Sequence, residues 1–206
     1  MKMDKETIPK LISDINYVKS ADIPNIDLYM DQVTSFMETQ LKSTKRNDDD
    51  KVLTKTMINN YAKNDLLPAP LKKKYSKEHL LILTFIYYFK NILTMKDIEM
   101  ILKPITEKYF NTESEINFAR IYDEVCSYEA ERVELIQNDI DTLYNKSLNT
   151  FSDVEDENRD ELQFFAFICS LTLDVYAKKL LIERLIDEMP SAIPTEKEKD
   201  KDKKKK

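Results

Sequence analysis

Polar and basic side chains gather between positions 55 and 74 in a pattern that suits nucleic-acid binding. Asparagine can pair with both hydrogen-bonding groups on one edge of adenine, and lysine can reach guanine or a phosphate. The residues that carry this chemistry are Lys55, Thr56, Asn59, Asn60, Lys63, Lys72, Lys73 and Lys74. The first five are expected to face a DNA groove, and the three consecutive lysines are expected to reach the flanking phosphate backbone.

No comparable set of residues indicates catalysis. The chain has one histidine, His79, and two widely separated cysteines, Cys126 and Cys169. It contains no glycine, which excludes the glycine-rich loops that cradle phosphates in nucleotide-binding proteins. We therefore expect no enzyme activity, no cofactor and no metal site. His79 is expected to be an ordinary first-turn histidine, and the cysteines small buried side chains, with a thiol sensor or a pair across a dimer as the alternative.

Charge is distributed unevenly along the chain. The whole sequence has a formal net charge of −6. Residues 42–90 hold eleven Lys or Arg and five acids, which gives +6, whereas residues 111–189 hold seven bases and nineteen acids, which gives −12. A basic segment attracts a phosphate backbone, and an acidic one should face away from it. The alternative is that both segments are simply solvated helix faces.

The predicted groove-facing residues fall on a short helix. Thr54 can cap a helix that runs to about Asn64, with Met57, Ile58 and Tyr61 on its inner side. Pro68 and Pro70 then stop helix formation. Ser76 caps a further helix to about Asn91, which is apolar on nearly every side and is therefore expected at the centre of a small bundle.

The flanking sequence predicts more helices. We expect helices from Thr7 onward, over 27–42, from the Thr94 and Asp97 capping box, over 113–148 and over 160–188, with a charged loop at 43–51. Pro104 is expected to kink or end the helix that contains it. The lack of glycine also disfavours two-residue hairpins with primed turns, so extensive β structure is not expected.

The helix over 113–148 carries apolar residues at alternating spacings of three and four, which is typical of a coiled coil. We call this set the seam residues: Ala119, Tyr122, Cys126, Val133, Ile136, Ile140 and Leu143. Two interpretations remain open, a coiled-coil dimer and a helix that packs on its own chain.

The stretch from Leu53 to Tyr75 resembles the DNA-binding head of MerR-type regulators. Its matching residues are Leu53 and Thr54, Ile58 and Tyr61, Leu66-Leu67-Pro68, Tyr75-Ser76 and Met95 to Ile98. It differs from that pattern where Thr56 and Asn59 replace arginines, where Asp65 replaces a glycine, and in a shortened wing. The whole chain is also similar to an uncharacterised bacterial family, the YkrK-like domain of unknown function, including its start at Ile23 to Met30.

The resemblance implies an all-α fold, with a MerR-like winged helix-turn-helix head followed by long C-terminal helices. We expect the head and N-terminal helices over 1–110, a helical region for dimerisation or effector binding over 111–190, and a disordered Lys-rich tail over 191–206. The resemblance implies a dimeric transcription regulator that binds double-stranded DNA. The N-terminus lacks the run of a signal peptide and the longest apolar stretch, 164–177, is too short and polar to span a bilayer, so we expect the protein in the cytoplasm. No residue pattern indicates a small-molecule effector or a membrane segment. The alternative is a helical protein-interaction module whose helix-turn-helix does not bind DNA.

Overall fold

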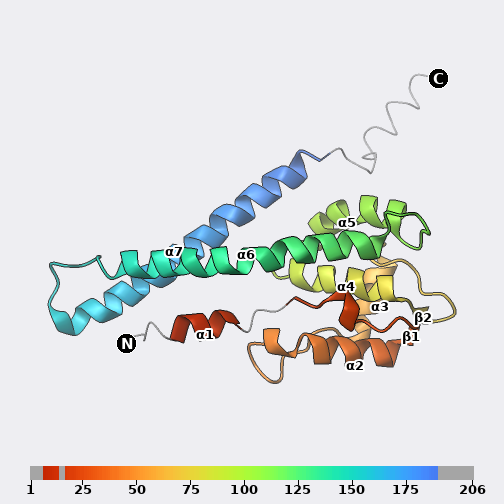
Figure 1. Cartoon of the computed structure of the whole chain (residues 1–206), viewed down its shortest axis with the longest axis horizontal. Coiled ribbons are helices and arrows are strands. Elements are labelled where there is room, and N and C mark those ends of the chain that lie inside the picture. Colours follow the sequence, from red (N-terminus) through yellow and green to blue (C-terminus); the bar gives the residue numbers. More distant parts are fainter. Residues whose placement is uncertain (1–6, 14–16, 190–206) are drawn as a thin grey trace, which may run out of the picture.

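The computed structural model describes residues 7–13 and 17–189, and this part of the chain is mostly helical, as the sequence predicts (Figure 1). The helices are α1 (Thr7–Ser13), α2 (Met30–Gln40), α3 (Lys55–Lys63), α4 (Lys77–Phe89), α5 (Met95–Tyr109), α6 (Phe118–Ser147) and α7 (Asp156–Asp187). Two short strands, β1 (Leu28–Tyr29) and β2 (Lys74–Tyr75), and two 3-10 turns, Ser20–Asp22 and Lys42–Thr44, complete the described elements. The predicted tail over 191–206 lies outside the described residues.

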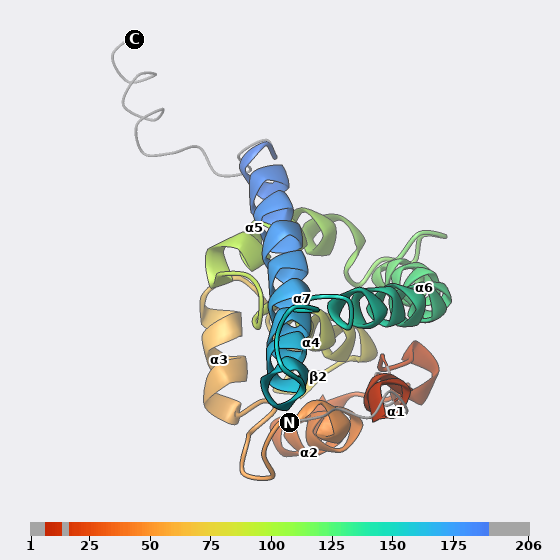
Figure 2. The same ribbon diagram turned by 90° about the vertical axis from the view of Figure 1, so that its left-hand side faces the viewer.

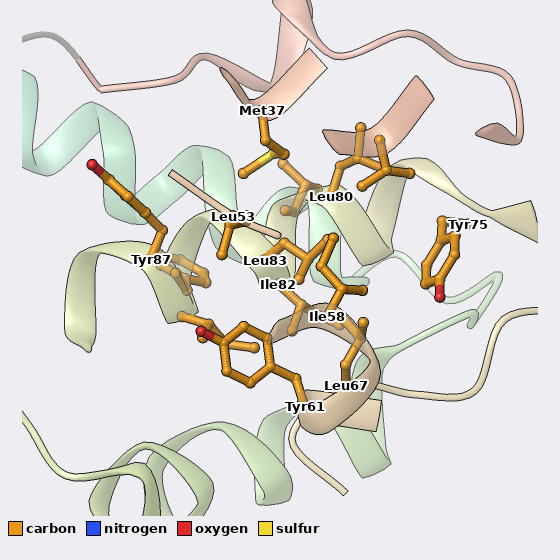
Figure 3. Packing of buried hydrophobic residues seen from close by; sticks show 14 of the residues in the cluster. Met37, Leu53, Ile58, Tyr61, Leu67, Tyr75, Leu80, Ile82, Leu83 and Tyr87 are labelled. Carbon is orange, nitrogen blue, oxygen red and sulfur yellow. The ribbon is translucent and has the colours of Figure 1, made fainter. Parts of the chain in front are cut away.

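Helix α4 is the centre of the main hydrophobic core. Nine consecutive residues of α4, from His79 to Tyr87, are buried, so every side of this helix is covered. Figure 3 shows Met37 of α2 and Ile58 of α3 pointing toward the side chains of α4. The expectation of a helix at the centre of a small bundle is therefore confirmed.

The main core extends into α6. Phe118 and Tyr122, in the first two turns of α6, are fully buried with the residues of α4 and α5, and Cys126 packs against the same cluster. We call residues 18–126 the head, because Val18 and Cys126 are the first and last residues of this core. The core thus continues beyond position 110, where the sequence analysis places the end of the head.

The predicted helix starts rest on local hydrogen bonds that the structure contains. The side chain of Thr54 accepts a hydrogen bond from the Met57 N–H at 3.2 Å. Thr94 and Asp97 form the predicted capping box, in which each side chain accepts from the backbone N–H of the other. Side chains that accept from otherwise unpaired N–H groups fix where a helix begins. Because the capping residues are recognisable by type, the sequence predicts these two helix starts.

Three predicted boundaries are wrong. Helix α2 begins at Met30 instead of position 27, because Leu28 and Tyr29 pair with β2. Helix α6 begins at Phe118 instead of 113, where the Asn117 side chain caps it by accepting from the Arg120 N–H. Helix α7 begins at Asp156, four residues before its predicted start.

Pro104 does not end its helix. Helix α5 continues from Met95 through Pro104 to Tyr109. A proline inside a helix removes one hydrogen bond, at a cost of roughly 3 kcal/mol. Leu102 and Thr106, on either side of the proline, are both buried. Packing on both sides therefore holds the backbone in its helical course.

Helices α6 and α7 form a long antiparallel hairpin whose turn lies at the opposite end of the molecule from β1 and β2 (Figure 1). A second, smaller core holds this end together, with Ile8 of α1, Tyr144 of α6 and Phe167 of α7 buried. The Gln163 side chain donates to the carbonyl oxygens of Leu148 and Thr150, at 2.8 and 3.0 Å, and so fastens the connecting turn. Within the described ranges, no helix combines the length and apolar character that crossing a membrane would require.

Candidate nucleic-acid interface

Helix α3 divides cleanly into a buried side and an exposed side. Ile58 and Tyr61 are buried in the main core, at 0% and 6% exposure, and Met57 is partly buried. The five residues predicted to face a groove are all exposed: Lys55, Thr56, Asn59, Asn60 and Lys63. Figure 2 shows α3 at the edge of the head, on the opposite side from α6. The polar side of α3 is therefore open to a ligand as large as a duplex.

The end of α3 is a Schellman motif built without glycine. The N–H of Leu66 donates to the Tyr61 carbonyl at 2.9 Å, and the N–H of Asp65 donates to the Ala62 carbonyl at 3.4 Å. This pattern requires a left-handed residue after the helix, and Asp65 has φ 56°. Asp65 therefore takes a conformation that glycine most often occupies at the end of a helix.

The segment between α3 and α4 contains a tight turn. Leu66 and Leu67 are buried and anchor its start. The Lys74 N–H then donates to the Leu71 carbonyl at 2.9 Å, and these two residues form an antiparallel bridge. The two residues between them, Lys72 and Lys73, have φ 50° and 66°.

This turn corrects an expectation from the sequence. Positive φ at both central residues is the hallmark of a type I′ turn, which glycine and asparagine usually occupy. The absence of glycine predicts that such turns are disfavoured, yet Lys72 and Lys73 form one. Both lysines are exposed at its tip. The small sheet supports the turn, because β2 pairs with β1 in the register Leu28 with Tyr75 and Tyr29 with Lys74.

Aromatic contacts fix the base of the turn. The Lys74 ammonium lies 5.2 Å from the centre of the Tyr29 ring, which holds this lysine closer to the head than its two neighbours. Tyr75 is buried and meets the His79 ring edge-on at 5.5 Å, and Phe110 meets the same ring at 4.8 Å. His79 is thus a core residue at the start of α4, beneath the segment that carries the lysines.

His79 also caps α4. Its Nδ1 accepts a hydrogen bond from the Ser76 N–H at 3.0 Å, which places the proton of the neutral ring on Nε2. Nε2 is buried without a hydrogen-bond partner in the described part of the chain. Burial lowers the pKa of His79, and the nearby backbone of Pro68 and Ala69 opposes this shift only in part. The ring is therefore held neutral, which suits packing and capping.

The lysines of the candidate interface differ in whether they form ion pairs. Lys55 forms an ion pair with Asp31, in the first turn of α2, and both side chains are largely exposed. Among the described residues, Lys63, Lys72 and Lys73 form no ion pair. Asp31 lies 24 positions before Lys55, and neither sequence spacing nor a motif signals their contact.

The charged loop over 43–51 adds little positive charge. Lys45 donates to Glu38 at 2.7 Å. This hydrogen bond lowers the pKa of Glu38 and raises that of Lys45. Asp48, Asp49 and Asp50 line a shallow depression beside it. No group of acids, histidines or cysteines in the described residues could hold a metal ion.

The seam residues pack within their own chain. Ala119, Tyr122 and Cys126 contact the main core, and Ile140 and Leu143 contact the smaller core around Phe167. Val133 and Ile136 are partly buried between these two groups. These contacts correspond to the second arrangement left open by the sequence, a helix packed on its own chain. Cys126 and Cys169 are both free and partly buried.

The family model described as a domain of unknown function (DUF1836) matches residues 18–125. This range covers more than half of the 206 residues and coincides with the head, which ends at Cys126. No curated protein and no solved structure matches the chain.

Proposed function

Since this chain belongs to the family described as a domain of unknown function (DUF1836), we propose its function from its surface: it is a dimeric, DNA-binding regulator of transcription. In this proposal the head is of the MerR type, as in the YkrK-like relatives that the sequence resembles, and the protein acts in the cytoplasm. Helix α3 enters the major groove, and the turn at Lys72 and Lys73 contacts the adjacent backbone.

The observation that carries the proposal is that α3 has one buried apolar side and one exposed polar side. Its apolar side is locked into the core, and its other side presents only polar or basic residues. An α-helix such as α3 is about 10–12 Å across with its side chains, which fits a major groove about 12 Å wide. Asn59 and Asn60 are of the residue type that reads adenine, and Lys63 of a type that reaches guanine or phosphate.

The lysine turn gives independent support. A left-handed conformation costs a residue with a Cβ roughly 1–2 kcal/mol, and Lys72 and Lys73 both adopt it. Glycine would remove this cost but would carry no charge. Two lysines at the tip of a fixed hairpin suit the binding of phosphates beside the groove.

The distribution of charge along the chain favours DNA binding at α3. Residues 42–90 carry +6, whereas residues 111–189 carry −12. The far end of the α6–α7 hairpin lies at the other end of the molecule from α3 and β2 (Figure 1). Duplex bound at α3 would therefore be remote from the acidic turn of the hairpin.

Fluorescence anisotropy with labelled genomic duplexes between 50 and 200 mM salt tests the proposal. Binding is expected to weaken with salt, because each phosphate contact releases counterions. The double variant Lys72→Ala, Lys73→Ala should bind more weakly and lower the salt slope by about 1.8, which corresponds to two phosphate contacts. Asn59→Ala should relax sequence discrimination at a cost of about 1–3 kcal/mol.

Lys178→Ala is the matched control, because Lys178 is an exposed lysine of α7, far in the sequence from the proposed interface. It should leave binding unchanged. Binding that does not depend on salt, or that responds equally to Lys178→Ala and to the double variant, would contradict the proposal.

The second candidate is a protein-interaction module with a head that does not bind DNA. The ion pair between Lys55 and Asp31 favours it, because it neutralises one of the two lysines on α3. Under this alternative, the anisotropy of every duplex stays flat at low salt, and immobilised protein retains a partner whose binding survives the double lysine variant.

A further inference from the structure

An exposed apolar side chain stands at the base of the turn formed by Lys72 and Lys73. Leu71 is 74% exposed, more than any other large apolar residue that the structure describes. Its backbone is nevertheless fixed, because its carbonyl accepts from the Lys74 N–H at 2.9 Å and because Pro70 precedes it. Leu71 is therefore exposed on an ordered hairpin.

Leu71 belongs to a row of three side chains across the small sheet. Lys74 pairs with Leu71 on one side and with Tyr29 of β1 on the other. Residues directly opposite each other on antiparallel strands point to the same side of a sheet, so these three share one side. Leu28 and Tyr75, at the next register position, are buried on the other side. We call Leu71, Lys74 and Tyr29 the outer row.

The charge around the outer row indicates a polyanion as its partner. Residues 66–77 contain four lysines and no acid. The two lysines at the tip of the turn form no ion pair within the described ranges. The ion pair between Lys55 and Asp31 joins the start of α3 to the start of α2, which directly follows Tyr29. The outer row therefore lies next to the beginning of α3.

We propose that Leu71 is a wedge that enters the minor groove of DNA and unstacks one base step, while Lys72 and Lys73 hold the phosphates beside it. This inference rests on the proposed function, because it concerns the duplex that α3 binds. An apolar side chain gains nothing from hydrated phosphates, but between two bases it is removed from water. Leucine is among the residues with which DNA-bending proteins open base steps from the minor groove.

The dimensions of the hairpin favour insertion of a single side chain. The minor groove is about 6 Å wide, and the two strands of a hairpin already lie about 4.8 Å apart without their side chains. The backbone of the turn therefore cannot enter an undistorted groove, whereas one side chain at its edge can. Because the backbone of Leu71 is fixed in the free protein, little freedom is lost on insertion.

The test uses two duplexes of about 24 base pairs with the same composition and charge, one alternating T and A and the other with all A on one strand. The first contains a flexible TpA step at every second position, and the second contains none. Wild type should bind the alternating duplex at least about fivefold more tightly, because TpA steps unstack easily. Leu71→Ala should reduce this preference to less than about twofold and leave the salt slope unchanged, since the phosphate contacts remain.

Replacing one adenine of the alternating duplex with 2-aminopurine reports unstacking directly, because the fluorescence of this base rises when it leaves the stack. Wild type and Leu71→Met should raise the fluorescence, since methionine can also act as a wedge, and Leu71→Ala should not. Leu185→Ala is the matched control, because it removes a leucine of α7 that is 60% exposed, and it should behave as wild type. Circular dichroism verifies that all variants remain helical.

The outcomes distinguish the wedge from the function on which it rests. If neither duplex binds in a salt-dependent manner, the proposed function fails and the wedge fails with it. If the duplexes bind but the fluorescence does not rise, or rises equally with Leu71→Ala, the wedge is overturned and DNA binding stands. Co-sedimentation with phosphatidylserine vesicles checks another anionic partner. Vesicle binding that Leu71→Ala abolishes, without any unstacking of DNA, would assign Leu71 to a membrane surface and overturn the proposal.

Discussion

Replacing Asp65 with glycine should stabilise the head, and the reason can be worked from the structure. Asp65 has φ 56° and closes the Schellman motif at the end of α3. The left-handed conformation costs a residue with a Cβ roughly 1–2 kcal/mol. Glycine removes this cost but gains about 0.5–1 kcal/mol of chain entropy in the unfolded state. Asp65→Gly should therefore raise the free energy of unfolding by about 0.5–1 kcal/mol.

Asp65→Ala is the matched comparison, because it removes the same charge and keeps a Cβ. The glycine variant should exceed the alanine variant by about 1 kcal/mol, or by about 2–4 °C in Tm for a protein of this size. Urea denaturation followed by circular dichroism, together with thermal melts, measures both. If the alanine variant is as stable as the glycine variant, residue 65 is not left-handed and the motif at the end of α3 is wrongly described.

Three further substitutions test other parts of the structure. Asp31→Asn should tighten DNA binding in the anisotropy assay, because it frees Lys55 from its ion pair; unchanged affinity would exclude Lys55 from the interface. Tyr122→Phe removes the buried hydrogen bond to the Val18 carbonyl, 2.6 Å long, and should cost about 1–3 kcal/mol in urea denaturation, whereas Tyr128→Phe at an exposed site should change stability by less than about 0.5 kcal/mol. The pKa of His79 lies below its ordinary value of 6.5 in the folded protein, so the unfolded chain binds the proton first as pH falls. Stability should therefore decrease as pH falls below about 7, by up to about 1.4 kcal/mol per pH unit until His79 titrates in the folded protein, and His79→Gln should remove that part of the slope.

Features that depend on neighbouring residues were predictable from the sequence. The cap at Thr54, the capping box at Thr94 and the burial of α4 each follow from a few adjacent residues. The two sides of α3 likewise follow from helical periodicity, which placed Ile58 inside and Asn59 outside.

Features that depend on distant residues were not predictable. The start of α2 moved because β2, more than 40 residues later, pairs with Leu28 and Tyr29. Periodicity identified the apolar side of α6 but could not say whether its cover comes from the same chain. The turn at Lys72 and Lys73 was missed because residue type alone argues against positive φ, and here the fold imposes it.

The sharing of α6 between two cores has a mechanical consequence. Phe118 and Tyr122 anchor one end of this helix in the head, and Tyr144 anchors the other end beside α7. A helix of 30 residues is about 45 Å long, so a tilt of about 5° at one end displaces the other by about 4 Å. Head and hairpin cannot pivot separately unless one core opens. If the proposed dimer forms at the hairpin end of α6, this rigid strut would set the distance and angle between the two α3 helices, and with them the spacing of the two DNA half-sites that the protein could read.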